Sequence, residues 1–166
     1  MLSKKVIITG SFGVGKTSLF SRFVYSRFDE KYLTTIGVKV DKRTVHVDGT
    51  DISLLLWDIA GEVRQNKVPQ SYFLGAAGII YVFDLSRPST FDNIVNDMQH
   101  LRKLLPHAEI ICVGNKLDLL SEAELTSVKQ QIMVQPDYLS SAKTGENVEA
   151  LFLELARTLV KNVAAA

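Results

Sequence analysis

Residues 10–17 read GSFGVGKT and fit the pattern G-x-x-x-x-G-K-[S/T]. The apolar run Val6-Ile7-Ile8 comes directly before this stretch, and a segment of helical period follows it. A strand, a glycine-rich loop and a helix in that order are the context that the pattern requires. Backbone amides of such a loop converge on phosphate oxygens at the positive end of the following helix. The stretch therefore predicts a phosphate-binding loop in an α/β fold.

Two side chains of this loop have predicted roles of their own. Lys16 places a positive charge between the β- and γ-phosphates of a nucleoside triphosphate, and Thr17 offers its hydroxyl to Mg²⁺. The loop alone does not identify the base, because users of adenine and of guanine nucleotides both carry it. The predicted phosphate-binding residues of this stretch are Ser11, Phe12, Gly13, Val14, Gly15, Lys16, Thr17 and Ser18.

Short runs rich in valine and isoleucine alternate with segments of helical period along the rest of the chain. The runs lie at residues 6–8, 54–57, 79–83 and 110–113, with a weaker one at 138–139, and are typical of strands buried on both faces. The predicted helices cover about residues 16–25, 90–105, 122–132 and 147–161. This alternation predicts an α/β fold with a mostly parallel sheet.

Residues 38–57 follow a different pattern. Val45 and Val47 alternate with polar neighbours, and Asp48-Gly49 is a typical two-residue hairpin turn. We therefore expect one antiparallel edge strand in this otherwise parallel sheet.

Composition limits the kind of protein. The 166 residues are 46% hydrophobic and include 19 basic against 18 acidic residues, so we expect one domain over residues 1–166 and no nucleic-acid partner. The single cysteine, Cys112, lies in an apolar run and favours a core position in a reducing, cytoplasmic protein. Residues 161–166 contain no cysteine and no basic cluster, so we expect no membrane anchor there, and we expect a monomer.

A base-recognition motif follows the run at residues 110–113. Residues 115–118 read NKLD, and ligands of α/β sheets lie outside the carboxyl ends of such strands. Asp118 can accept hydrogen bonds from N1–H and from the N2 amine of guanine, whereas adenine has neither donor at those positions. The motif therefore predicts GTP rather than ATP, which disfavours an ATP-dependent kinase.

A second motif, Ser141-Ala142-Lys143, follows the run near Leu139. Alone, such a tripeptide is most often a solvated turn, but here it accompanies a phosphate-binding loop and Asp118. We expect the Ala142 amide to meet guanine O6 and the Lys143 stem to cover the ring. The residues predicted from these motifs to bind guanine are Asn115, Lys116, Asp118, Ser141, Ala142 and Lys143.

The hairpin and the loops beside it supply candidate metal ligands. Asp58 ends the second hairpin strand, where its carboxylate can hold a water bound to Mg²⁺. Thr35 can coordinate the ion only when a γ-phosphate is present, and the Gly61 amide can donate to that phosphate. The predicted Mg²⁺ site is therefore Thr17, Thr35 and Asp58, with a loop that changes between nucleotide states.

These elements occur together in one order: residues 10–17, 35–37, 58–61, 115–118 and 141–143. The set resembles the small GTPases of the Ras superfamily over nearly the whole chain, and residues 72–76 and 141–148 resemble the Rab branch. The resemblance implies a P-loop NTPase three-layer α/β/α fold with a six-stranded sheet, five strands parallel, and about five helices. It implies further that Phe28 stacks edge-on against guanine and that Tyr32 closes over the γ-phosphate.

The resemblance also implies a switch that alternates between GTP and GDP. It would hydrolyse GTP with Mg²⁺ and contact effector, exchange-factor or activating proteins through residues 26–37 and 60–74. The expected catalytic residues are Lys16, Thr35, Gly61 and Glu62.

Glu62 departs from the family, which usually has a glutamine that orients the attacking water. A carboxylate can accept a hydrogen bond from water but cannot donate one toward the γ-phosphate, and its charge opposes the charge that develops there. We therefore expect slow intrinsic hydrolysis. The alternative is that Glu62 points to solvent.

Phe12 is a second departure, because the family favours a small residue at this position. The ring either obstructs the arginine finger of an activating protein or packs on a switch loop as an apolar cover. Together, Phe12 and Glu62 leave open an alternative function, a weakly hydrolysing guanine-nucleotide-binding interaction module. Val40 replaces the aromatic residue that Rab proteins commonly pair with Trp57 and Tyr72, which affects effector choice.

Overall fold

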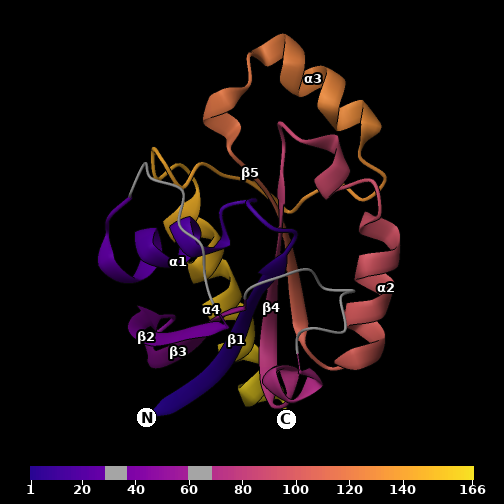
Figure 1. Ribbon diagram of the computed structural model, residues 1–166. Coiled ribbons are helices and arrows are strands. Elements are labelled where there is room, and N and C mark those ends of the chain that lie inside the picture. The colour runs from indigo at the N-terminus through magenta and orange to yellow at the C-terminus, as the bar shows by residue number, and fades with distance from the viewer. Residues whose placement is uncertain (29–36, 60–68) are drawn as a thin grey trace.

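The computed structural model describes residues 1–28, 37–59 and 69–166 (Figure 1). Its strands are β1 (Leu2–Gly10), β2 (Val38–Val47), β3 (Thr50–Ile59), β4 (Ala76–Asp84), β5 (Glu109–Asn115) and β6 (Tyr138–Leu139). The α-helices in these ranges are α1 (Lys16–Tyr25), α2 (Ile94–Leu104), α3 (Glu122–Gln131) and α4 (Val148–Ala165). Short 3₁₀ helices cover Gln70–Phe73, Pro88–Thr90 and Leu117–Leu119.

The six strands form one sheet in the order β2-β3-β1-β4-β5-β6. β2 pairs antiparallel with β3, and every other neighbouring pair is parallel, as the sequence predicted. The hairpin turn consists of Asp48 and Gly49, which have φ angles of 48° and 79°. Two consecutive residues of positive φ match the twist of the flanking strands, so the DG pair sets the hairpin register.

Two core clusters lie on opposite faces of the sheet, which makes the fold three layers deep (Figure 1). Val6 and Ile8 of β1 point into the cluster covered by α1 and α4, and Ile7 between them points into the cluster covered by α2. This alternation explains the continuous apolar runs, because a strand covered on both faces needs apolar side chains on both. Leu125 and Val128 of α3 pack against the second cluster.

Cys112 belongs to the second cluster and is buried, as expected. Its burial, together with the nearby charge of Asp137, raises the pKa of the thiol to about 12. The thiol is therefore neutral at physiological pH and acts as a small apolar core residue.

Helix α2 begins at Ile94, a few residues later than the predicted start at about residue 90. The reason is a local turn, in which the Thr90 hydroxyl accepts a hydrogen bond from the Asp84 amide at 2.9 Å. Pro88 opens a 3₁₀ helix that ends at Thr90, so the chain enters α2 only after this turn. Within the described ranges, no helix combines the length and apolarity needed to cross a bilayer.

Candidate functional site

The predicted phosphate and base motifs meet at one edge of the sheet, where the parallel strands end. Gly10 ends β1, Asp84 ends β4 and Asn115 ends β5. The loops that follow these strands contact one another through side-chain hydrogen bonds. This edge is where α/β sheets bind their ligands.

Glycine is required in the phosphate loop for space as well as for conformation. Gly10 has φ +146°, and a β-carbon there would lie 2.1 Å from the Val82 carbonyl oxygen. Gly15 has φ +101°, and a β-carbon there would lie 2.3 Å from Asn115 Nδ2. Helix α1 starts directly after Gly15, so its first amides meet no side chain at the N-cap position, which is the geometry of an anion site.

Lys16 is held by its own loop. Its ammonium donates to the carbonyl oxygens of Gly10 at 2.9 Å and Ser11 at 2.8 Å. The Lys16 side chain is buried, so the loop carbonyls fix a positive charge in a place of reduced solvation. A buried cation at the mouth of an amide-lined loop attracts an anionic ligand.

Two of the three predicted metal ligands come together. The Thr17 hydroxyl donates to Asp58 Oδ2 at 2.6 Å, which joins the first turn of α1 to the end of β3. Asp58 is 0% exposed. A hydroxyl beside a buried carboxylate is a donor set that suits a hard cation such as Mg²⁺, so these residues fit the predicted ion.

The base motifs also meet, although they lie far apart in the sequence. Asp118 Oδ1 accepts a hydrogen bond from the Ser141 hydroxyl at 2.7 Å, and the Ser141 Oγ accepts one from the Thr144 amide at 3.1 Å. Asp118 is exposed, so its carboxylate is held in place and still reaches solvent. The Ala142 amide, predicted to meet guanine O6, donates within the protein to Asn115 Oδ1 at 3.2 Å. A bond to guanine would have to share or replace that one.

Asn115 connects the phosphate loop to the base loop. Its Nδ2 donates to the Val14 carbonyl at 3.0 Å, while its Oδ1 accepts from the Ser140 hydroxyl at 3.0 Å and from Ala142. The residue is only 1% exposed. The sequence predicted Asn115 as a guanine-binding residue, and the structure adds a bracing role that the sequence did not indicate.

Lys116 contacts the phosphate loop as well. Its ammonium donates to the Gly13 carbonyl at 2.8 Å and lies 3.1 Å from Asp84 Oδ2. Sequence reasoning missed Asp84, a buried carboxylate whose only signal was its place at the end of an apolar strand. It also missed Arg22 of α1, which donates to the Ala142 carbonyl at 2.8 Å and to the Lys143 carbonyl, and so ties α1 to the base loop.

The remaining predicted residues are placed as follows. Phe28 is partly buried against the cluster under α1 and α4, and Val14 is fully buried, so only its backbone can meet a ligand. Phe12 is 55% exposed, so its ring stands at the surface of the loop. The predictions for Tyr32, Thr35, Gly61 and Glu62 lie outside the described residues.

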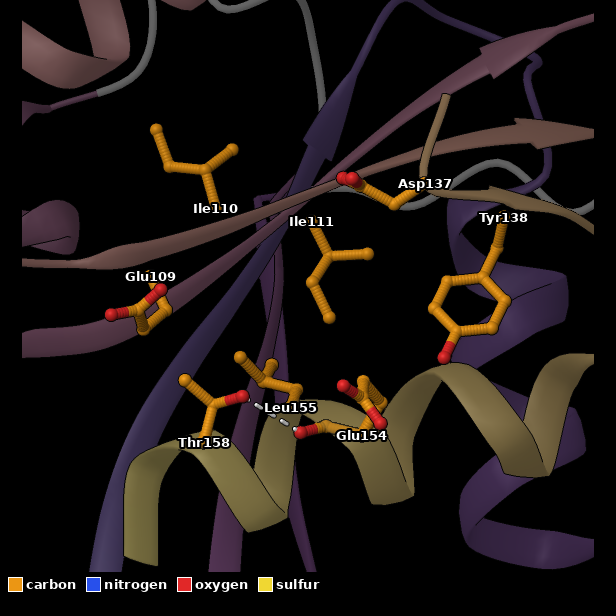
Figure 2. A pocket seen from close by; sticks show the side chains of 8 residues that line it. All are labelled: Glu109, Ile110, Ile111, Asp137, Tyr138, Glu154, Leu155 and Thr158. Carbon is orange, nitrogen blue, oxygen red and sulfur yellow. Dashed lines mark hydrogen bonds between the residues drawn. The ribbon is translucent and has the colours of Figure 1, made fainter. Parts of the chain in front are cut away.

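A separate pocket of about 410 Å³ lies between β5, β6 and α4 (Figure 2). Glu109 and Tyr138, the first residues of β5 and β6, line it together with Leu155 and Thr158 of α4. It therefore lies at the amino ends of the strands, opposite the carboxyl ends where the motifs meet. None of the predicted nucleotide-binding residues lines this pocket, so the pocket is distinct from the candidate site.

Comparison with known proteins decides the family, because the Ras family model matches residues 5–161. The chain belongs to the Ras family. It is 37% identical over 164 residues to Ras-related protein Rab-4 of Dictyostelium discoideum, covering 96% of this chain and 80% of that protein. It is 37% identical to human Rab-4B, covering 96% and 77% of the two chains, and 39% identical over 165 residues to human Rab-12, covering 96% and 68%.

This Ras-family chain is therefore a Rab-like small GTPase that binds guanine nucleotide and acts as a switch. Members of this family bind regulators and effectors in general. The expected P-loop α/β fold is confirmed, with five parallel strands and one antiparallel edge strand.

Proposed function

We propose that this GTPase is a single GTP-binding domain over residues 1–166 that hydrolyses GTP slowly and with Mg²⁺. The observation that carries the proposal is the Asn115 side chain, which bonds the phosphate loop on one side and the base loop on the other. One buried amide thus sets the distance between the groups predicted to hold the triphosphate and those predicted to hold the purine.

The proposed roles follow from charge and position. Lys16 and the amides of the phosphate loop bind the phosphates and stabilise the charge that develops on them in the transition state. Asp118 selects guanine, with Phe28, Lys116, Ser141 and the residues after it lining the base site. The catalytic set is Lys16, Thr35, Gly61 and Glu62, and Tyr32 covers the γ-phosphate.

The metal site proposed for this chain is Thr17, Thr35 and Asp58. Mg²⁺, when bound there, would neutralise phosphate charge. Thr17 and Thr35 offer hydroxyl oxygens, and Asp58 holds a water by its carboxylate. The hydrogen bond between Thr17 and Asp58 supports this set, because it already aligns two of the three side chains.

The proposed partners are effector, exchange-factor and activating proteins that contact residues 26–37 and 60–74, and the proposed state is a cytoplasmic monomer. Val40 pairs across the hairpin with Trp57, whose ring centroid lies 6.1 Å from that of Tyr72. Val40 is exposed and smaller than an aromatic residue. At Val40 this surface therefore offers less apolar area than an aromatic residue would. The difference favours effectors other than those of Rab proteins that have an aromatic residue at this position.

The nucleotide carried by the purified protein tests the proposal directly. We expect GDP or GTP at close to one per chain when protein purified in Mg²⁺ is denatured and its nucleotide is separated by chromatography. Incubation should then convert bound GTP to GDP and phosphate, and EDTA should accelerate nucleotide release. Adenine nucleotides, or no nucleotide and no binding in calorimetry with Mg²⁺, would contradict the assignment.

Slow hydrolysis is expected from Glu62 and Phe12. In single-turnover assays, Glu62→Gln should hydrolyse GTP on the order of tenfold faster, because it restores a donor and removes a charge near the γ-phosphate. Phe12→Gly should respond more strongly to an activating protein, because it opens the path for an arginine. If both variants hydrolyse GTP at the wild-type rate, with and without activating protein, this expectation is wrong. A wild type that releases no phosphate over hours would favour the alternative function, a weakly hydrolysing guanine-nucleotide-binding interaction module.

A further inference from the structure

Three consecutive carbonyls of the phosphate loop are held by donors from outside the loop. Arg87 Nη1 donates to the Phe12 carbonyl at 3.2 Å, Lys116 Nζ to the Gly13 carbonyl at 2.8 Å, and Asn115 Nδ2 to the Val14 carbonyl at 3.0 Å. The donors come from two different strand ends, those of β4 and β5.

These contacts also orient the amides of the loop. In a trans peptide the carbonyl of one residue and the N–H of the next point in opposite directions. The described chain has no cis peptide, so each held carbonyl turns the following N–H, those of Gly13, Val14 and Gly15, to the opposite side. These amides lead directly into the first turn of α1 and extend its anion-binding end.

The Arg87 backbone is fixed by its own turn. Its N–H donates to the Asp84 carbonyl at 3.0 Å, and its carbonyl accepts from the Thr90 amide at 2.9 Å and the Thr90 hydroxyl at 2.8 Å. Pro88 follows and disfavours a helical conformation at Arg87, which has φ −129° and ψ 94°. The side chain therefore reaches the loop from a rigid base.

Asp84 supplies the countercharge. Its Oδ2 lies 3.1 Å from Lys116 Nζ and 3.9 Å from Arg87 Nη1, while its Oδ1 accepts from the amide and hydroxyl of Ser86 at 2.8 and 2.6 Å. The Asp84 carboxylate is buried. One buried carboxylate thus lies within ion-pair distance of both cations that hold the loop, and its charge favours their positions.

We propose that Arg87 is a positioning residue of the phosphate site, which turns the Gly13 amide toward the phosphates by holding the Phe12 carbonyl. The proposal rests on the proposed phosphate-binding function of residues 10–17 and extends it to a residue outside the nucleotide motifs. Arg87 acts through the Phe12–Gly13 peptide. The carbonyl that Arg87 holds belongs to Phe12, the residue at which this loop departs from the family.

The test compares full-length Arg87→Ala and Arg87→Lys with wild type and with Arg157→Ala. Arg157 is a matched control, because its side chain is 43% exposed against 45% for Arg87 and its ion-pair partners are Asp48 and Glu154. The readouts are the dissociation rate of fluorescent GDP and the ³¹P chemical shift of the β-phosphate of bound GDP. Thermal melting of each variant checks the fold.

We expect GDP to leave Arg87→Ala about 3- to 10-fold faster, the loss of one hydrogen bond of ordinary strength. The ³¹P shift should move, Arg87→Lys should recover part of both effects, and Arg157→Ala should match wild type. Wild-type dissociation and ³¹P shift in Arg87→Ala would overturn the proposal and leave the proposed function intact. A changed melting temperature with an unchanged ³¹P shift would overturn it too, since that marks a merely structural role.

Two further outcomes are decisive. A wild type that binds no guanine nucleotide would remove the proposed function itself, and the proposal with it. Should Arg87→Ala fail to fold, Arg87→Met takes its place, because it keeps a long side chain and lacks an N–H donor to the Phe12 carbonyl. Faster GDP dissociation and a moved ³¹P shift in Arg87→Met then support the proposal, and values equal to those of wild type overturn it.

Discussion

We expect Asp118→Asn to lower the affinity for GTP on the order of a thousandfold and to shift the preference toward xanthosine nucleotides. The carboxylate is expected to accept two charge-assisted hydrogen bonds from guanine, and an asparagine amide would place a donor against one of those donors. Xanthine carries a carbonyl where guanine carries its amine, so the asparagine amide can donate to it. Competition against fluorescent GDP with GTP, XTP and ATP measures the change.

The substitution Asp118→Asn is expected to leave the contact between the two base motifs in place. Asparagine keeps an Oδ1 that can accept from the Ser141 hydroxyl, so the contact between the base motifs survives. Asp92→Asn is the matched control, the same chemical change at an exposed residue outside the predicted nucleotide motifs. GTP affinity in Asp118→Asn equal to that of the control would show that the base is selected elsewhere.

We expect Gly15→Ala to reduce the affinity for GDP and GTP on the order of a hundredfold. Its β-carbon would lie 2.3 Å from Asn115 Nδ2, in a backbone of φ +101° that only glycine adopts without strain. To make room, the Asn115 side chain must leave the Val14 carbonyl and the Ala142 amide. The strain and the lost hydrogen bonds, about 1 kcal/mol each, sum to roughly 3 kcal/mol.

Gly49→Ala is the control that introduces backbone strain at a positive φ without a steric clash of the β-carbon. Gly49 has φ +79° and open space around its α-carbon, and it lies in the hairpin turn. We expect this variant to bind nucleotide as wild type does, with a melting temperature lower by a few degrees. Calorimetric titration with GDP and Mg²⁺ compares the two variants. Equal affinities would mean that the hydrogen bonds of the Asn115 side chain do not contribute to nucleotide affinity.

The parts of the protein that could be predicted from the sequence are those with local signals. Residues 10–17 predicted the phosphate loop because a strand run, glycines and a helical period are adjacent in the chain. The DG pair predicted the hairpin for the same reason, and the alternation of strands and helices predicted the mostly parallel sheet, whereas the order of its strands came from the structure. The guanine assignment of Asp118 came from base chemistry and stays a prediction, as do the roles of Thr35 and Glu62.

The tertiary structure alone decided which groups hold the loops together. Asn115 and Val14 are 101 positions apart, and Arg87 and Phe12 are 75 apart, so no local pattern marks either hydrogen bond. Such contacts exist because parallel strands bring their carboxyl ends to one edge, where each following turn can reach the neighbouring loop. Sequence determined the kinds of groups at each strand end, and packing of the strands determined which of them meet.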